Sequence, residues 1–120
     1  MRLSKNFVST EFASPDNKAS GLMMNKDFIK KLQIARDLAG IEFVINSAYR
    51  TPEHNRKVGG KTNSAHLRGF ACDIATPSPS AKFTTLKSLL DAGFTRIGIY
   101  ENFIHCDTDP SLPAGVIWTK

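Results

Sequence analysis

Two histidines and one aspartate are the residues of this sequence best suited to chemistry. His66 and Asp73 share the segment Ser64–Asp73, and His105 follows further along the chain. On one helix, His66 and Asp73 would be two turns apart, roughly 10 Å, and could not share a metal ion. Gly69 between them permits a turn that carries His66, followed by a strand that carries Asp73 and folds back on it. Both side chains could then lie ~2 Å from one zinc ion.

His105 is the third candidate ligand. On a strand, His105 and Asp107 face one side, while Ile104 and Cys106 face the other. Two imidazoles and one carboxylate leave one position of a tetrahedral zinc site open for water, as in catalytic sites. Zinc-activated water can attack an amide carbonyl near neutral pH. The spacing alone leaves a second interpretation open, in which these are polar residues at strand ends that bind no metal.

Hydrophobic periodicity and capping residues predict the elements that must position these side chains. The predicted helices are residues 25–39, a short helix that starts at Thr51, and residues 80–92. The predicted strands are residues 41–49, 71–75, 95–100, 103–108 and 116–118. Residues 95–100 and 103–108 form a predicted hairpin that turns at Glu101–Asn102. This pattern predicts an α+β fold with a small antiparallel sheet and helices packed on one face.

Apolar stripes and strand alternation predict which side chains are buried. The stripes Phe28/Leu32/Leu38 and Phe83/Leu86/Leu90 are expected to face the core. Cys72 and Cys106 adjoin the candidate ligands, but alternation points them away from the ligand face and toward the helices. We therefore predict that both cysteines are buried thiols.

Length and composition limit the class of protein. The 120 residues, 41% hydrophobic, predict one domain over residues 1–120. No apolar stretch approaches the ~20 residues that cross a bilayer, so no membrane insertion is expected. Residues 1–7 lack the apolar core of a secretory signal, which predicts a chain that is cytoplasmic as synthesised. The net charge of +5 favours an anionic partner without identifying it.

The segment Ser64–Asp73 matches the pattern Ser-x-His-x-x-Gly-x-Ala-x-Asp in full. It resembles the zinc D-alanyl-D-alanine carboxypeptidase family, which shares its fold with lysostaphin-type and hedgehog-like peptidases. The resemblance covers roughly Phe7 to Trp118. Further matching segments, in the family's order and spacing, are Ser47–Asn55, Val58–Gly60, Ile97–Tyr100 and Phe103–Asp107.

The resemblance implies a role for each matching residue. It makes His66, Asp73 and His105 the zinc ligands. Arg50 falls where the family places an arginine that holds the substrate's carboxylate, and the alternative is a surface arginine at a strand end. Ser64 would offer a hydroxyl to the substrate or the zinc ligands, or it closes the loop by a hydrogen bond. Asp107 would orient a zinc-bound imidazole, or it pairs with an Arg or Lys.

The sequence departs from the family at the general base. Better-known members carry Glu or Asp three residues before the last ligand, or His two residues before it, where this chain has Asn102 and Phe103. Glu101 is the nearest carboxylate and is the candidate base if a bulge in the hairpin brings it into range. A regular strand would leave it ~13 Å from His105. A related branch of murein hydrolases also lacks the usual base, so this departure does not predict inactivity.

The resemblance implies a zinc peptidase that acts, as a carboxypeptidase or endopeptidase, on the peptides of bacterial peptidoglycan. Small size, positive charge and the missing signal suit a monomeric phage endolysin, released to the wall by a lysis system or carried on a phage particle. The alternative is a catalytically inactive, zinc-stabilised module of the same fold that binds wall peptide or another partner. Only the charge favours a nucleic-acid-binding protein, and no stacking aromatics interleave with a basic stripe, so no nucleic acid is expected.

Overall fold

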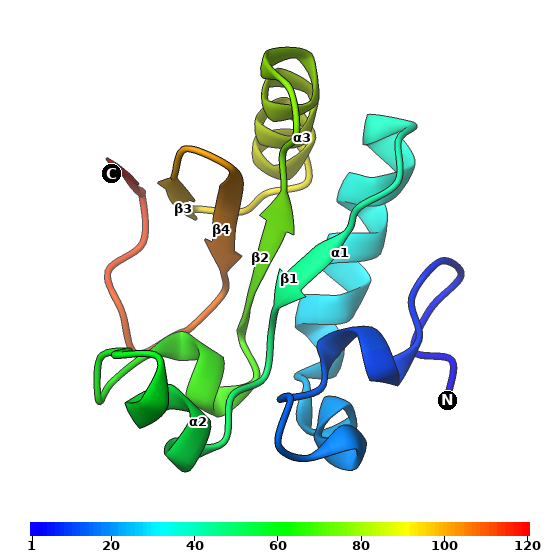
Figure 1. The fold of residues 1–120 in the computed structure, drawn as a ribbon. Coiled ribbons are helices and arrows are strands. Elements are labelled where there is room, and N and C mark those ends of the chain that lie inside the picture. Colours follow the sequence, from blue (N-terminus) through cyan, green and yellow to red (C-terminus); the bar gives the residue numbers. More distant parts are fainter.

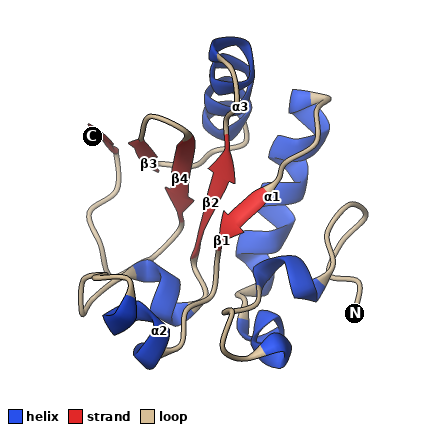
Figure 2. Cartoon of the chain, viewed as in Figure 1, coloured by secondary structure: helices blue, strands red, loops and turns tan.

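The computed structural model describes residues 1–120 as a five-stranded sheet with helices packed against it (Figure 1). The strands are β1 (Ile45–Ser47), β2 (Ala71–Ala75), β3 (Arg96–Ile99), β4 (Phe103–Asp107) and β5 (Val116–Thr119). The α-helices are α1 (Lys26–Ala39), α2 (Pro52–Lys57) and α3 (Pro79–Asp91), and short 3-10 helices span Ser9–Phe12, Lys18–Met23 and Ala65–Arg68 (Figure 2). No helix combines the length and apolar character needed to cross a membrane.

The helices begin at the capping residues that the sequence offers. The side chain of Asn25 accepts a hydrogen bond from the Phe28 amide, and Thr51 and Ser78 cap α2 and α3 in the same way. Gly40 ends α1 in the left-handed conformation, at φ +66°. The predicted helices 25–39 and 80–92 are therefore confirmed to within one residue at each end, and the short helix begins one residue after Thr51.

The strands lie in the order β1-β2-β4-β3-β5. The pairs β1–β2, β2–β4 and β3–β4 are antiparallel, whereas β5 returns to lie parallel to β3. The predicted α+β class is confirmed, with a sheet that is mixed because of β5. The predicted strand 41–49 is shortened to Ile45–Ser47, where the register with β2 is irregular.

The core lies between one face of the sheet and helices α1 and α3. Its sheet side chains are Cys72, Ile74, Ile97, Ile104 and Cys106, which pack with Phe28, Leu32 and Leu89 of the helices. The two cysteine sulfurs lie 3.8 Å apart as free thiols, and burial raises the pKa of Cys72 well above its usual range. The prediction of buried thiols on the helix-facing side is confirmed.

The predicted apolar stripes are wrong at three positions. Leu38, Phe83 and Leu90 are 57%, 67% and 45% exposed. The buried residues of α3 are instead Thr85, Ser88 and Leu89, so a different face of this helix meets the core. Ser88 tolerates burial because its hydroxyl donates to the Thr85 carbonyl at 2.9 Å.

Candidate metal centre and active-site cleft

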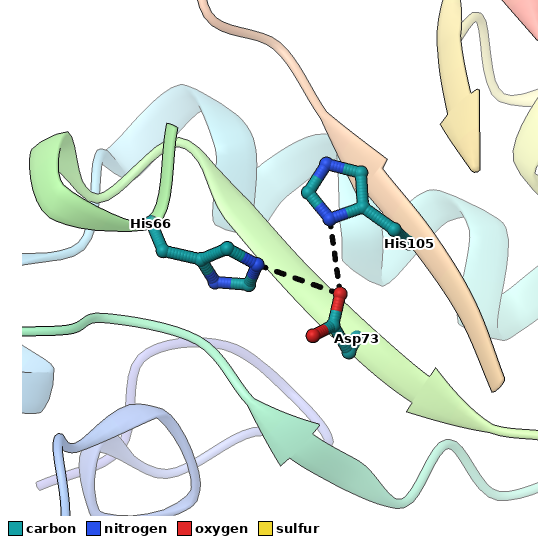
Figure 3. A group of neighbouring side chains, drawn as sticks. All are labelled: His66, Asp73 and His105. Carbon is teal, nitrogen blue, oxygen red and sulfur yellow. Dashed lines mark hydrogen bonds and ion pairs between the residues drawn. The ribbon is translucent and has the colours of Figure 1, made fainter. Parts of the chain in front are cut away.

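Three structural elements bring the candidate ligands together on the open face of the sheet. In the antiparallel pair β2–β4, Asp73 lies directly opposite His105. His66 stands on the 3-10 helix Ala65–Arg68, which Ser64 caps and which ends at Gly69 in the left-handed conformation, at φ +77°. The backbone then turns into β2, so the His66 ring approaches Asp73 from the side (Figure 3). This is the turn-and-strand path that Gly69 was predicted to permit.

The geometry of the three side chains suits one metal ion. Asp73 Oδ1 lies 3.5 Å from His66 Nε2 and 3.0 Å from His105 Nδ1. The potential ligand atoms all lie within 4.8 Å of one another. His66, Asp73 and His105, hereafter the ligand trio, are therefore positioned to bind a metal ion.

The second nitrogen of each ring already has a hydrogen-bond acceptor. His66 Nδ1 lies 2.6 Å from the Ala48 carbonyl, and His105 Nε2 lies 2.7 Å from Asp107 Oδ2. Each of these nitrogens therefore carries a proton and donates it. The opposite nitrogens, which face Asp73, are left to ligate. Two imidazoles oriented in this way and one carboxylate form a donor set that fits zinc and leaves one coordination position open.

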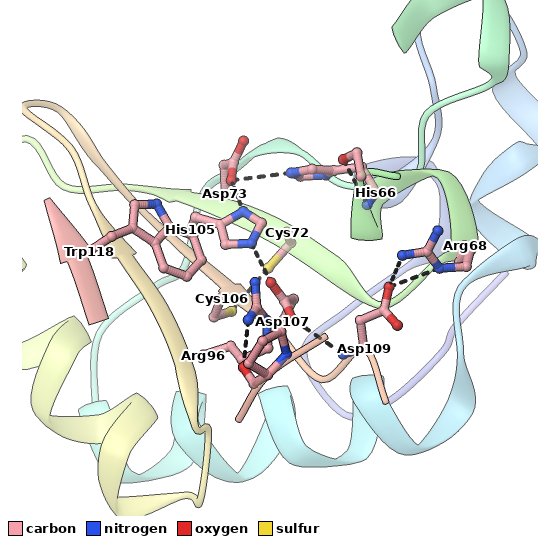
Figure 4. A network of polar contacts seen from close by, with 12 residues as sticks. His66, Arg68, Cys72, Asp73, Arg96, His105, Cys106, Asp107, Asp109 and Trp118 are labelled. Atoms are coloured by element: carbon pink, nitrogen blue, oxygen red, sulfur yellow. Dashed lines mark hydrogen bonds and ion pairs between the residues drawn. The ribbon is translucent and has the colours of Figure 1, made fainter. Parts of the chain in front are cut away.

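Asp107 contacts the nitrogen of the His105 ring opposite the one that faces Asp73 (Figure 4). Its side chain is 1% exposed, and its Oδ1 accepts hydrogen bonds from Arg96 Nε at 2.7 Å and from the Asp109 amide at 3.2 Å. Both contacts that the sequence left as alternatives, with the imidazole and with an arginine, are therefore made at once. A carboxylate with both oxygens engaged fixes the orientation of the ring that it contacts.

Burial and charge act in opposite directions on the titration of this cluster. Burial alone would raise the pKa of Asp73, but hydrogen bonds from His105 and His66 and their charges hold it well below the usual range. Burial alone would lower the pKa of His105, but Asp107 and Asp73 outweigh it and raise the pKa to about 9. In the metal-free protein His105 is thus a cation between two carboxylates.

The charged His105 gives the metal-free protein a pH-dependent stability. Its folded-state pKa of about 9 exceeds the ordinary value of 6.5, so its contribution is full below pH 6.5 and lost as the pH rises through 9. We expect the free energy of unfolding of chelator-treated protein, measured by urea denaturation, to fall across that interval. His105→Gln should flatten the slope. A free energy that rises over the same interval in the unmodified protein would contradict this origin.

The ligand trio lines a cleft of about 650 Å³ that also contains Arg50 and Ser64. Arg50 donates to Ser47 Oγ and Asn55 Oδ1, both at 3.3 Å, and its Nη2 lies 3.8 Å from Asp73 Oδ2. Arg50 is thus held beside the trio with its guanidinium in the cleft. Ser64 Oγ accepts a hydrogen bond from the His66 amide at 3.2 Å, the loop-closing contact that was one of its two alternatives.

Glu101 lies in the β3–β4 turn, with its side chain exposed and outside the residues that line the cleft. A role as base depended on a bulge, but the β3–β4 register is constant from the pair Arg96–Asp107 to the pair Ile99–Ile104. The turn is also fixed by Lys82, whose Nζ donates to the Glu101 carbonyl at 3.0 Å. The structure therefore does not bring Glu101 to the trio.

Arg96, Tyr100 and Trp118 are among the cleft residues that lie beyond the sites predicted from the sequence. A signal for the first two was present in the predicted hairpin. A turn at Glu101–Asn102 sets Arg96 opposite Asp107 and places Tyr100 two residues from the partner of His105. The sequence holds no such signal for Trp118, because the connection between β4 and β5 does not reveal that β5 pairs with β3.

Comparison with known proteins identifies the family of the chain. A search of curated proteins finds no match to the chain. A family model described as Peptidase M15 matches residues 5–107, which include the whole ligand trio, Arg50, Ser64 and Asp107. With most of its length matched and a possible metal site on the open face of the sheet, the chain belongs to the peptidase M15 family.

Proposed function

We propose that this protein is a zinc peptidase that hydrolyses peptide bonds in the stem or cross-link peptides of bacterial peptidoglycan. The observation that carries the proposal is the ligand trio, which lies in a cleft with the second nitrogen of each imidazole already hydrogen-bonded. A zinc ion bound there would supply Lewis acidity to polarise the scissile carbonyl and to activate water.

Residues around the trio are assigned to hold the substrate. Arg50 presents a planar guanidinium that can bind a substrate carboxylate with two hydrogen bonds. The hydroxyl of Ser64 lines the cleft and can donate to the peptide while it accepts from the His66 amide. The exposed cations Lys61 and Lys120 also line the cleft, and they favour the acidic stem peptides of the wall. Asp107 keeps the His105 ring oriented throughout.

We propose further that residues 1–120 are a single peptidase domain that works as a monomer. The compact size and the charge of +5 support a phage endolysin, which a lysis system releases to the wall or a phage particle carries there.

The proposal is tested by digestion of purified peptidoglycan, with the products identified by mass spectrometry. The wild type is expected to release peptide fragments whose masses identify the bond cleaved, and His66→Ala should release none. His54→Ala is the matched control, because His54 lies on α2 and does not line the cleft. Zinc bound by the wild type with no product at any pH tried would favour the inactive binding module instead.

A further variant in the same digestion, Glu101→Gln, tests the general base. An exposed side chain outside the cleft should leave turnover within about twofold of the wild type. A general base contributes at least ~100-fold, so a loss of that size would show that the hairpin rearranges when substrate binds.

A further inference from the structure

The C-terminal strand adds a side chain to the cleft that lies outside the family match. β5 pairs in parallel with β3, and its register sets Trp118 beside Gly98. The match to the peptidase family ends at residue 107, so this strand belongs to the part of the chain that the match leaves out. Trp118 nevertheless lines the same cleft as the ligand trio.

The indole of Trp118 is held in one position by contacts on several sides. Its Nε1–H donates to the Tyr100 hydroxyl at 3.0 Å, and the Arg96 guanidinium lies 5.3 Å from its ring centre. The ring also covers Gly98 closely, since a Cβ at that position would lie 2.6 Å from indole atoms. Gly98 is therefore the residue that gives the indole its place on the sheet.

The fixed indole borders the ligand trio on one side. Its ring centre lies 5.4 Å from that of His105, and Figure 4 shows Trp118 and His66 on opposite sides of His105. Tyr100, which accepts the indole hydrogen bond, stacks on Phe103 with ring centres 4.4 Å apart. Together Trp118, Tyr100 and Phe103 form an aromatic wall of the cleft.

The sheet order separates this wall from Arg50. Arg50 follows β1 at one edge of the sheet, the ligand trio includes residues of the central β2 and β4, and Trp118 stands on β5 at the other edge. Lys120 also reaches the cleft near the wall, but it is exposed, whereas the Arg50 side chain is 17% exposed and held by two hydrogen bonds. The cleft thus has a fixed cation on one side of the trio and a fixed apolar surface on the other.

We infer that Trp118 is a specificity-determining residue, which contacts the substrate side chain on the acyl side of the scissile bond and favours an apolar group there. The inference rests on the proposed peptidase function. If Arg50 binds the carboxylate of the leaving residue, the scissile carbonyl lies at the trio and the acyl-side residue lies against the aromatic wall. The charge of Arg96 is neutralised by Asp107, so the wall favours apolar groups over charged ones.

The test compares kcat/KM for three peptides: an N-acylated D-Ala-D-Ala, the same peptide with Gly on the acyl side, and one with Gly on the leaving side. The wild type is expected to prefer D-Ala over Gly on the acyl side by about fourfold, the effect of burying one methyl group. Trp118→Ala should abolish this preference and leave the zinc content and the leaving-side preference unchanged. A preference that survives in Trp118→Ala, or is lost on the leaving side instead, overturns the inference.

Two further variants separate the indole from the strand that carries it. Gly98→Ala keeps Trp118 but displaces its ring, since the three atoms nearest to the new Cβ all belong to the indole. It should weaken the acyl-side preference as Trp118→Ala does. Ile117→Ala alters the opposite, exposed face of the same strand and should leave the preference intact. Equal effects of Ile117→Ala and Gly98→Ala would show that the strand matters and the indole does not.

Fluorescence distinguishes failure of this inference from failure of the proposed function. Trp118 is the one tryptophan of the chain, so its emission reports on the cleft alone. The acyl D-Ala-D-Ala peptide should shift that emission saturably, with a lower apparent Kd than the peptide with Gly on the acyl side. A shift without cleavage would refute the peptidase function and support contact between Trp118 and the peptide. Cleavage without a shift would refute that contact and support the peptidase function.

Discussion

Replacement of Asp73 by alanine is expected to abolish zinc retention and, with it, any peptidase activity. Asp73 Oδ1 is the one group that faces both His66 Nε2 and His105 Nδ1. Without it, two neutral imidazoles remain, and the charge that offsets the ion is lost. Removal of a hydrogen-bonding partner of a ligand typically costs 10–100-fold in metal affinity. Removal of the carboxylate ligand itself should therefore cost more than ~100-fold.

The measurement is the zinc content of purified protein after dialysis, alongside product release from peptidoglycan. Asp73→Asn keeps the shape of the side chain and removes its charge, so it should fail almost as severely as Asp73→Ala. Asp91→Ala is the matched control, because Asp91 pairs with Lys87 on the surface of α3. A chain with Asp73→Ala that retains one zinc ion per molecule would place the metal elsewhere.

The trio was predictable because local rules place each side chain and the resemblance brings the three together. Gly69 marks a turn that only a residue tolerant of positive φ makes easily, and strand alternation separates Asp73 and His105 from Cys72 and Cys106. The resemblance then selected these three side chains from among other polar residues. The turn and the alternation depend on residues a few positions apart, the range over which a sequence pattern is reliable. The pairing of β2 with β4, which sets Asp73 opposite His105, joins distant segments and was implied by the resemblance alone.

What was not predictable depends on contacts between distant segments. The stripe Phe83/Leu86/Leu90 has helical spacing, but the face of α3 that meets the core is set by how α1 and α3 pack together, and Thr85 and Ser88 occupy it. The role of Glu101 depended on whether the hairpin has a bulge, which the sequence alone does not determine. The position of Trp118 depends on β5 returning parallel to β3 rather than on its own neighbours.

Replacement of Asp107 by alanine is expected to lower both stability and metal affinity, because Asp107 serves both. It is 1% exposed and binds Arg96 Nε and His105 Nε2, each at 2.7 Å. Its loss leaves the partly buried Arg96 guanidinium, 13% exposed, without its counter-ion, which should cost about 1–3 kcal/mol of stability. The freed His105 ring loses its fixed orientation, which should weaken zinc binding by about 10–100-fold.

Urea denaturation and zinc titration of the same variants separate the two effects. Asp107→Asn can still accept a hydrogen bond from His105 but cannot neutralise Arg96, so it should retain most of the zinc affinity and lose stability. Arg96→Met removes the cation as well, and in combination with Asp107→Asn it should recover part of the lost stability. Asp91→Ala is the control for stability, because the exposed pair of Asp91 and Lys87 contributes about 0.5 kcal/mol or less. If Asp107→Ala lowers neither the stability nor the zinc affinity more than Asp91→Ala does, then Asp107 neither supports the fold nor orients the ring. The imidazole of His105 must then be held by Asp73 and the bound metal alone.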